Sequence, residues 1–147
     1  MREIIFRAKR EDNGEWVYGY YVRMPDVEGS VHRMYVPAEN PDESNNVFYI
    51  DPQTVGQCTG LTDKNGTKIF EGDIVKVDDD FETFGKMAGE IREVWFKDGG
   101  FRLKPKYASS IARGDRGYWL EDGADYEVIG NIYDNPELLR GDTDDKP

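Results

Sequence analysis

Two residues of this chain belong to types that often carry nucleophilic or metal chemistry: the single histidine, His32, and the single cysteine, Cys58. A nucleophilic Cys–His pair needs the two side chains next to each other in space, which their positions in the sequence do not show. One histidine and one cysteine also cannot supply the usual four ligands of a zinc site without carboxylates or a second chain. No Lys, Arg or His lies within three residues of Cys58 to lower the pKa of its thiol. We therefore expect Cys58 to be buried, structural and unreactive.

The acidic residues offer a second kind of chemistry, the binding of a hard cation. Asp78, Asp79, Asp80 and Glu82 supply oxygen ligands, but their spacing lacks the glycine and the terminal glutamate of a calcium-binding EF-hand loop. With 30 Asp and Glu in the chain, no flanking pattern singles out a catalytic pair. The segment 114–117 lacks the following Lys-Ser/Thr of a phosphate-binding loop. We expect no metal, no cofactor and no enzymatic activity.

One segment combines basic and aromatic residues in a way that suits nucleic-acid binding. Its candidate site residues are Arg92, Lys97, Arg102, Lys104 and Lys106, interleaved with Trp95, Phe96, Phe101 and Tyr107. Cations beside aromatic rings can follow a phosphate backbone and stack against bases. Alternation along a strand would place Arg102, Lys104 and Lys106 on one face. The competing interpretation is a solvent face whose cations pair with the acids of residues 121–127.

The composition indicates a β-rich protein with an acidic surface. Of the 147 residues, 13% are aromatic and 16 are glycines, and the net charge is −11. Aromatic side chains bury large areas and favour strands, whereas glycines favour tight turns. A negative charge of this size repels nucleic acid at long range. A further interpretation of the acidic surface is mimicry of DNA to occupy another protein.

The elements that must position these residues are short strands joined by tight turns. Asp63-Lys64-Asn65-Gly66 has the residue types of a hairpin turn, as do Asp12-Asn13-Gly14 and residues 97–100. The expected strands cover residues 2–9, 15–24, 33–36, 47–50, 54–59, 73–77, 90–96, 101–104 and 126–133.

A few segments are expected to lie outside the strands. Residues 107–113 could form a short helix, and residues 78–89 a loop or one helical turn. Asn135 and Pro136 favour one turn of C-terminal helix that buries Leu138 and Leu139. We expect an all-β fold in a single domain over residues 1–140, followed by a disordered acidic tail over residues 141–147.

The N-terminal residues alternate charged with apolar types and contain no apolar signal-peptide core. No apolar run approaches the length that spans a bilayer. We therefore expect a cytoplasmic protein with no membrane association.

Three segments together resemble one known family. They are MREIIFRA at residues 1–8, VGQCTGLTDKNGTKIFEGDIV at residues 55–75 and EVIGNIYDNPELL at residues 127–139. In order and spacing they look like the YopX family of phage and prophage proteins. The resemblance implies a mostly β fold described as a complex barrel, and a phage or prophage origin in a bacterial host cell. It implies no catalytic or binding residues, so none can be carried over to this chain.

The function expected from these observations is that of a non-enzymatic accessory protein that binds a protein partner or itself. The segment Ile4-Ile5-Phe6 is apolar on both faces, and residues 17–21 also place apolar or aromatic types on both faces. Such strands lie either inside a closed barrel or at a subunit contact. We expect a homo-oligomer that uses the N-terminal hairpin. Nucleic-acid binding through residues 92–107 is the alternative function.

Overall fold

The computed structural model describes residues 3–38, 46–78, 89–121 and 126–142. This part of the chain is mostly β-structure in two antiparallel sheets, with little helix, as predicted. The chain divides into two compact units, residues 1–58 and residues 59–147. The single-domain interpretation of residues 1–140 stays a prediction.

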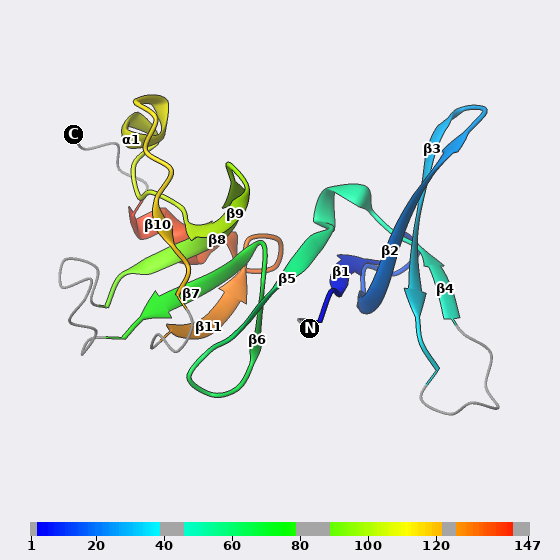
Figure 1. The fold of residues 1–147 in the computed structure, drawn as a ribbon, viewed down its shortest axis with the longest axis horizontal. Coiled ribbons are helices and arrows are strands. Elements are labelled where there is room, and N and C mark those ends of the chain that lie inside the picture. Colours follow the sequence, from blue (N-terminus) through cyan, green and yellow to red (C-terminus); the bar gives the residue numbers. More distant parts are fainter. Residues whose placement is uncertain (1–2, 39–45, 79–88, 122–125, 143–147) are drawn as a thin grey trace. The chain divides into compact units, whose positions relative to one another are not determined.

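The first unit is an antiparallel sheet built from successive hairpins, drawn in colours from blue through cyan to green in Figure 1. Its strands are β1 (Phe6–Lys9), β2 (Trp16–Asp26), β3 (Gly29–Val36), β4 (Asn46–Tyr49) and the start of β5 (Gly56–Thr62). Their order across the sheet is β4-β3-β2-β1-β5. β3 begins four residues earlier than expected because the β2–β3 pairing continues past Pro25 to the Asp26–Gly29 pair at the hairpin end.

One face of this sheet forms the core of the first unit. Ala8, Met34 and Ile50 are buried there, and the residues packed against them are Phe6, Val17, Tyr21, Val36 and Val55. Gly19 lies on the same face, directly opposite Phe6. A Cβ atom at Gly19 would collide with the backbone carbonyl of Tyr35, so only glycine fits this close strand approach.

A short 3-10 turn, η1 (Pro52–Thr54), makes the fifth strand start two residues later than the predicted strand 54–59, and the strand continues to Thr62. The Asp51 carboxylate accepts a hydrogen bond from the Gln53 amide over 3.1 Å, which caps the turn. The Thr54 hydroxyl donates to the Asp51 carbonyl and accepts from the Lys9 amide. These bonds hold Thr54 out of the ladder, so β5 starts at Gly56.

The second unit contains the other sheet, in the order β10-β9-β8-β7-β11. Its elements are β6 (Lys68–Phe70), β7 (Asp73–Val77), β8 (Ile91–Lys97), β9 (Gly100–Leu103), α1 (Ala108–Ala112), β10 (Tyr118–Trp119), β11 (Tyr126–Asn131) and η3 (Pro136–Asp142). β6 neighbours the end of β5. The buried core residues are Ile69, Val75, Val77, Val94, Leu103 and Tyr126.

The hairpin turn at residues 63–66 forms as its residue types predict. Gly66 has φ +81°, a conformation that side-chain-bearing residues rarely adopt. Asp63 is only 7% exposed. Its carboxylate accepts hydrogen bonds from the backbone amides of Asn65, Thr67 and Val128. The turn is therefore tied to β11, and it is a structural element of the second unit.

Three shorter segments form close to where the sequence predicts them. The predicted strand 73–77 matches β7, and the expected short helix at 107–113 appears as α1. The C-terminal turn is a 3-10 helix, which contacts β8 and leaves Leu138 and Leu139 half-buried. Most of the 78–89 loop and residues 143–147 of the expected tail lie outside the described residues.

Neither sheet closes on itself within the described residues. Each has two edge strands, β4 and β6 in one sheet and β10 and β11 in the other. The closed barrel is therefore not found. In the same part of the chain, no helix combines the length and the apolar character needed to cross a bilayer.

Candidate functional site

The basic and aromatic segment of the second unit forms a layered surface on one face of its sheet. Antiparallel register places Arg102 of β9 between Trp95 of β8 and Trp119 of β10. The guanidinium carbon of Arg102 lies 3.6 Å from the centre of the Trp119 ring, which is a close cation–π contact. A Cβ atom at Gly100 would collide with the Trp119 ring, so this glycine makes room for the indole.

Two lysines border the Trp95 ring of this surface. The ammonium groups of Lys97 and Lys104 lie 5.7 Å and 5.3 Å from the ring centre. Trp95 donates its indole N–H to the carbonyl of Arg116 over 3.0 Å, which fixes the ring. We call Trp95, Lys97, Arg102, Lys104 and Trp119 the tryptophan surface.

The other two predicted site residues lie elsewhere. Arg92 is only 8% exposed and stands opposite Val75, on the core face of the sheet, where it pairs with the Glu90 carboxylate. Lys106 follows the end of β9, where its ammonium lies 5.6 Å from the ring of Tyr107. The structure thus brings together three of the five predicted residues, and their role in binding stays a prediction.

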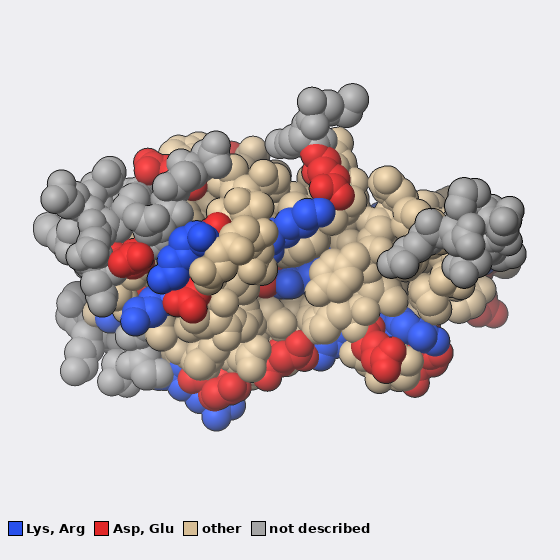
Figure 2. Space-filling model, turned by 90° about the horizontal axis from the view of Figure 1, so that it is seen from below, with Lys and Arg blue, Asp and Glu red and all other residues tan. Residues whose placement is uncertain are grey.

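Acidic side chains accompany the cations of the tryptophan surface. The Glu93 carboxylate lies 3.5 Å from the ammonium of Lys104, and Asp98 pairs with Arg116. Burial raises the pKa of Glu93, and Lys104 partly opposes this shift. Acidic and basic side chains likewise lie next to one another on the face of the molecule shown in Figure 2. The local charge of the tryptophan surface is therefore partly neutralised from within.

Sequence reasoning missed Trp119, although it makes the closest ring contact of this surface. β10 has only two residues, too few for the alternating pattern that identifies a strand. Gly117 was the available signal, because it has φ +84° and begins the return of the chain toward β9.

A second candidate surface is the face of the first sheet that points away from its core. Cross-strand pairs define it, among them Trp16 with Lys9, Tyr20 with Tyr35 and Arg33 with Tyr49. We call it the outer face, and its members are Arg7, Lys9, Trp16, Tyr18, Tyr20, Val22, Met24, Val31, Arg33, Tyr35, Val47 and Tyr49.

Aromatic rings of the outer face are unusually accessible. Tyr18, Tyr20 and Tyr49 are 48%, 54% and 57% exposed, and Met24 and Val47 are exposed as well. Cations lie beside several of the rings. Arg7 and Lys9 flank Trp16 at 4.9 Å and 5.4 Å, and the Arg33 guanidinium carbon lies 5.2 Å from the centre of the Tyr49 ring.

The charge of these strands differs from that of the whole chain. Strands β1 to β4 contain four basic residues and a single acidic one, Asp26, which ends β2 at the hairpin. The other acids near these strands occupy turns, such as Glu11, Asp12 and Glu28. The outer face is thus a basic and aromatic surface bordered by acidic turns.

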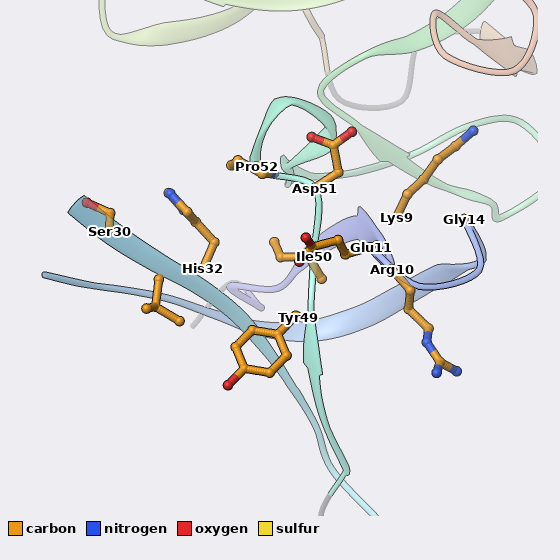
Figure 3. Close-up of a pocket in the computed structure, with 11 residues that line it drawn as sticks. Lys9, Arg10, Glu11, Gly14, Ser30, His32, Tyr49, Ile50, Asp51 and Pro52 are labelled. Atoms are coloured by element: carbon orange, nitrogen blue, oxygen red, sulfur yellow. The ribbon is translucent and has the colours of Figure 1, made fainter. Parts of the chain in front are cut away.

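The pocket in Figure 3 contains the single histidine, together with Ser30 and Asp51. It has a volume of about 720 Å³ and lies within the first unit. The His32 Nδ1 atom shares a 2.6 Å hydrogen bond with the hydroxyl of Tyr21. Arg10 points away from the pocket, and its guanidinium binds the Asp12 carboxylate. Cys58 is buried, as predicted, and is not among the residues that line this pocket.

The acidic cation candidates can be placed only in part. Asp79, Asp80 and Glu82 lie outside the described residues, while Asp78 pairs with Lys64 at 3.7 Å. Among the residues that the structure does describe, no group of three or more His, Cys, Asp or Glu side chains could hold a metal ion.

Comparison with known proteins gives consistent matches. The family model described as YopX protein matches residues 5–140. The SPbeta prophage-derived uncharacterized protein YopX of Bacillus subtilis (strain 168) is 37% identical over 76 residues, which are 52% of this chain and 53% of that protein. This chain therefore matches about half the length of that relative.

A solved structure extends the likeness over almost the whole chain. The crystal structure of protein EF1440 from Enterococcus faecalis has a TM-score of 0.51 at 27% identity, and the match covers 95% of this chain and 99% of that one.

Proposed function

This chain belongs to the YopX protein family, as its three motif segments predict, and we propose that it is a phage or prophage accessory protein that acts by binding a protein partner. The description of the Bacillus subtilis relative as prophage-derived supports the origin. The proposed place of action is the cytoplasm of the bacterial host cell, and the proposed activity involves no catalysis.

The observation that carries the proposal is the composition and exposure of the outer face. Protein interfaces are enriched in Tyr, Trp, Met and Arg and depleted in Glu and Asp. The outer face has this composition, with Tyr18, Tyr20, Tyr49 and Met24 exposed and Asp and Glu confined to its borders. Exposed aromatic side chains are frequent energetic anchors of protein complexes. We therefore assign partner binding to the outer face.

The partner test compares two tyrosines of equal type and similar exposure. Tyr20 lies on the outer face and is 54% exposed, whereas Tyr118 lies in β10 and is 53% exposed. Immobilised full-length chain would capture proteins from infected or induced host lysate, with and without nuclease. We expect a nuclease-resistant partner to be retained by the wild type and Tyr118→Ser, and lost with Tyr20→Ser. Equal retention by all three proteins would refute the assignment.

Self-association is the other form of this proposal. The outer face includes strands of the N-terminal hairpin, so a homo-oligomer would use part of the same surface. Light scattering on the wild type and Tyr20→Ser at micromolar concentration tests it. A monomer mass of 16.9 kDa for the wild type would exclude a stable homo-oligomer.

A second candidate function, nucleic-acid binding, is favoured by the contact between Arg102 and Trp119. A tryptophan with a guanidinium stacked at 3.6 Å offers a platform for a base and a charge for a phosphate. Binding of a fluorescent single-stranded oligonucleotide by Trp119→Ala and by the wild type tests it. Equal affinity of the two proteins would remove the tryptophan surface from consideration.

A further inference from the structure

We infer that the protein partner of the outer face presents carboxylate groups, so that an acidic segment of polypeptide docks on the rings and cations of strands β1 to β4. This inference rests on the proposed function and adds the chemistry of the partner. It follows from three features of the outer face: its charge, the state of Arg33 and the chemical mixture of its side chains.

The charge of the outer face is opposite to that of the whole chain. The protein carries −11, yet its first four strands hold four basic residues and only Asp26 as an acid. Three of the four basic residues, Arg7, Lys9 and Arg33, are on the outer side of the sheet, where Arg7 is only 6% exposed and Lys9 and Arg33 are half-buried. Complementary charges across an interface select partners and guide their encounter. A partner segment with carboxylates meets this requirement.

Arg33 is a cation of the outer face with few described internal partners. Its only described hydrogen bond is a long one, 3.4 Å from Nη2 to the Tyr49 hydroxyl. Its Nε atom is buried, and the described residues place no acceptor within hydrogen-bond distance of it. They also place no carboxylate within salt-bridge distance of the guanidinium. A guanidinium favours planar, two-point recognition of a carboxylate, which a partner could supply here.

The charge of the outer face argues against a second copy as its occupant. A closed symmetric dimer brings the same patch of both subunits together. Face-to-face docking would therefore bring the cations Lys9 and Arg33 of both subunits into one interface. Like charges gathered in one interface oppose association.

The chemical mixture of the outer face favours polypeptide over single-stranded nucleic acid. Four aliphatic side chains lie among the rings, namely Val22, Met24, Val31 and Val47. Such side chains gain from burial against apolar groups of a partner but offer no stacking platform to a base. A polynucleotide also carries a charge at every residue, and it would have to pass acidic turns that contain Glu11, Asp12 and Glu28.

The test uses random peptides displayed on phage as the probe and the immobilised full-length chain as the target. Each selected peptide is then measured against the wild type, Tyr20→Ser and Arg33→Gln, with Tyr118→Ser as the control outside the outer face. Unchanged thermal unfolding midpoints would show that the variants fold. The inference expects selected peptides that depend on Tyr20 to be rich in Asp and Glu. It expects Arg33→Gln to weaken them about tenfold, and added salt to weaken them further.

Each other outcome has a distinct meaning. Peptides that depend on Tyr20 but show no enrichment in acids, or bind Arg33→Gln as tightly as the wild type, would overturn the inference and leave the proposed function standing. A library that gives no Tyr20-dependent peptide would count against the proposed function itself. If the wild type binds a single-stranded oligonucleotide and Tyr20→Ser does not, the occupant of the outer face is nucleic acid and not an acidic polypeptide. If the wild type forms a dimer and Tyr20→Ser does not, the occupant is a second copy of the chain.

Discussion

The two surfaces of this protein contain the same kinds of side chain, but they differ in whether acidic side chains lie beside their cations. On the tryptophan surface, Lys104 lies 3.5 Å from Glu93, and the guanidinium of Arg102 stacks on Trp119. On the outer face, the cations lie beside rings, and the strands supply no acid except at the end of β2. Ring exposure does not separate the two surfaces, since Tyr20 is 54% exposed and Trp119 is 53% exposed.

This difference shows why a pattern of basic and aromatic residues is a weak guide to a binding site. Strand pairing can place an acidic side chain beside a cation. Glu93 pairs with Ile74 in the sheet, and its carboxylate lies beside the ammonium of Lys104. A cation that already has an internal carboxylate must lose that partner before it gains a new one. Arg33 of the outer face offers its charge at lower cost, although its segment looks like ordinary strand sequence.

The largest effect is expected from disturbing the sheet that presents the outer face. In Gly19→Ala, the new methyl group collides with the backbone carbonyl of Tyr35, which cannot move without separating β2 from β3. We expect a loss of about 3 kcal/mol in the free energy of unfolding, measured by urea denaturation. The variant should also lose partner binding. Wild-type stability would show that β2 and β3 do not approach as closely as described.

A somewhat smaller effect is expected at the buried acid of the second unit. Burial tends to raise the pKa of Asp63, but hydrogen bonds from the amides of Val128, Thr67 and Asn65 outweigh it and lower that pKa below 3.8. A carboxylate with a lowered folded-state pKa stabilises the fold above its unfolded pKa. That stabilisation is lost as pH falls through the folded value.

Asp63→Asn should therefore cost about 2 kcal/mol at pH 7, because one buried amide donor loses its acceptor. The variant should lose less stability than the wild type when the pH is lowered below about 4. Urea denaturation across this pH range measures both effects. Parallel pH profiles of the two proteins would contradict the role of Asp63, while partner binding at pH 7 should be unchanged wherever the variant is folded.

A smaller effect is expected at Gly100, because its steric neighbour is a side chain and not the backbone. The methyl group of Gly100→Ala collides with the indole of Trp119, which can rotate away. We expect a loss of about 1 kcal/mol and a change in tryptophan fluorescence as the ring leaves Arg102. An unchanged emission spectrum would contradict the stacked arrangement. Comparing its stability with that of Gly19→Ala distinguishes a collision with the backbone, which cannot move, from a collision with a side chain, which can.

The sequence was most informative about turns and least informative about faces. The Asp63–Gly66 turn was predictable because few residues tolerate the conformation of Gly66. The apolar segment after the turn at Gly72 predicted β7 to the residue, but such a segment does not state which face of a strand meets the core. Arg92 and Arg102 therefore looked equivalent, although register buries the first and leaves the second half-buried beside Trp95. Trp119 joined the surface through a long-range pairing that local pattern does not contain.

The smallest effect on stability, and the most direct test of the comparison, is expected from Glu93→Gln. Burial raises the folded-state pKa of Glu93 above its ordinary 4.5. Its contribution to stability is therefore present below the unfolded pKa and lost as pH rises through the folded value. At pH 7 the charged form is disfavoured by burial and favoured by Lys104. Removing the charge ends both effects, so we expect a change of at most about 0.5 kcal/mol, in the stabilising direction.

The same substitution frees Lys104 from its carboxylate. If internal neutralisation is what separates the two surfaces, Glu93→Gln should bind a single-stranded oligonucleotide about threefold more tightly than the wild type at low salt. The gain should disappear in the double variant with Trp119→Ala and leave peptide binding by the outer face unchanged. Oligonucleotide affinity that is the same with and without the Glu93 charge would mean that the acids do not suppress binding. The difference in charge between the two surfaces would then not account for a difference in binding.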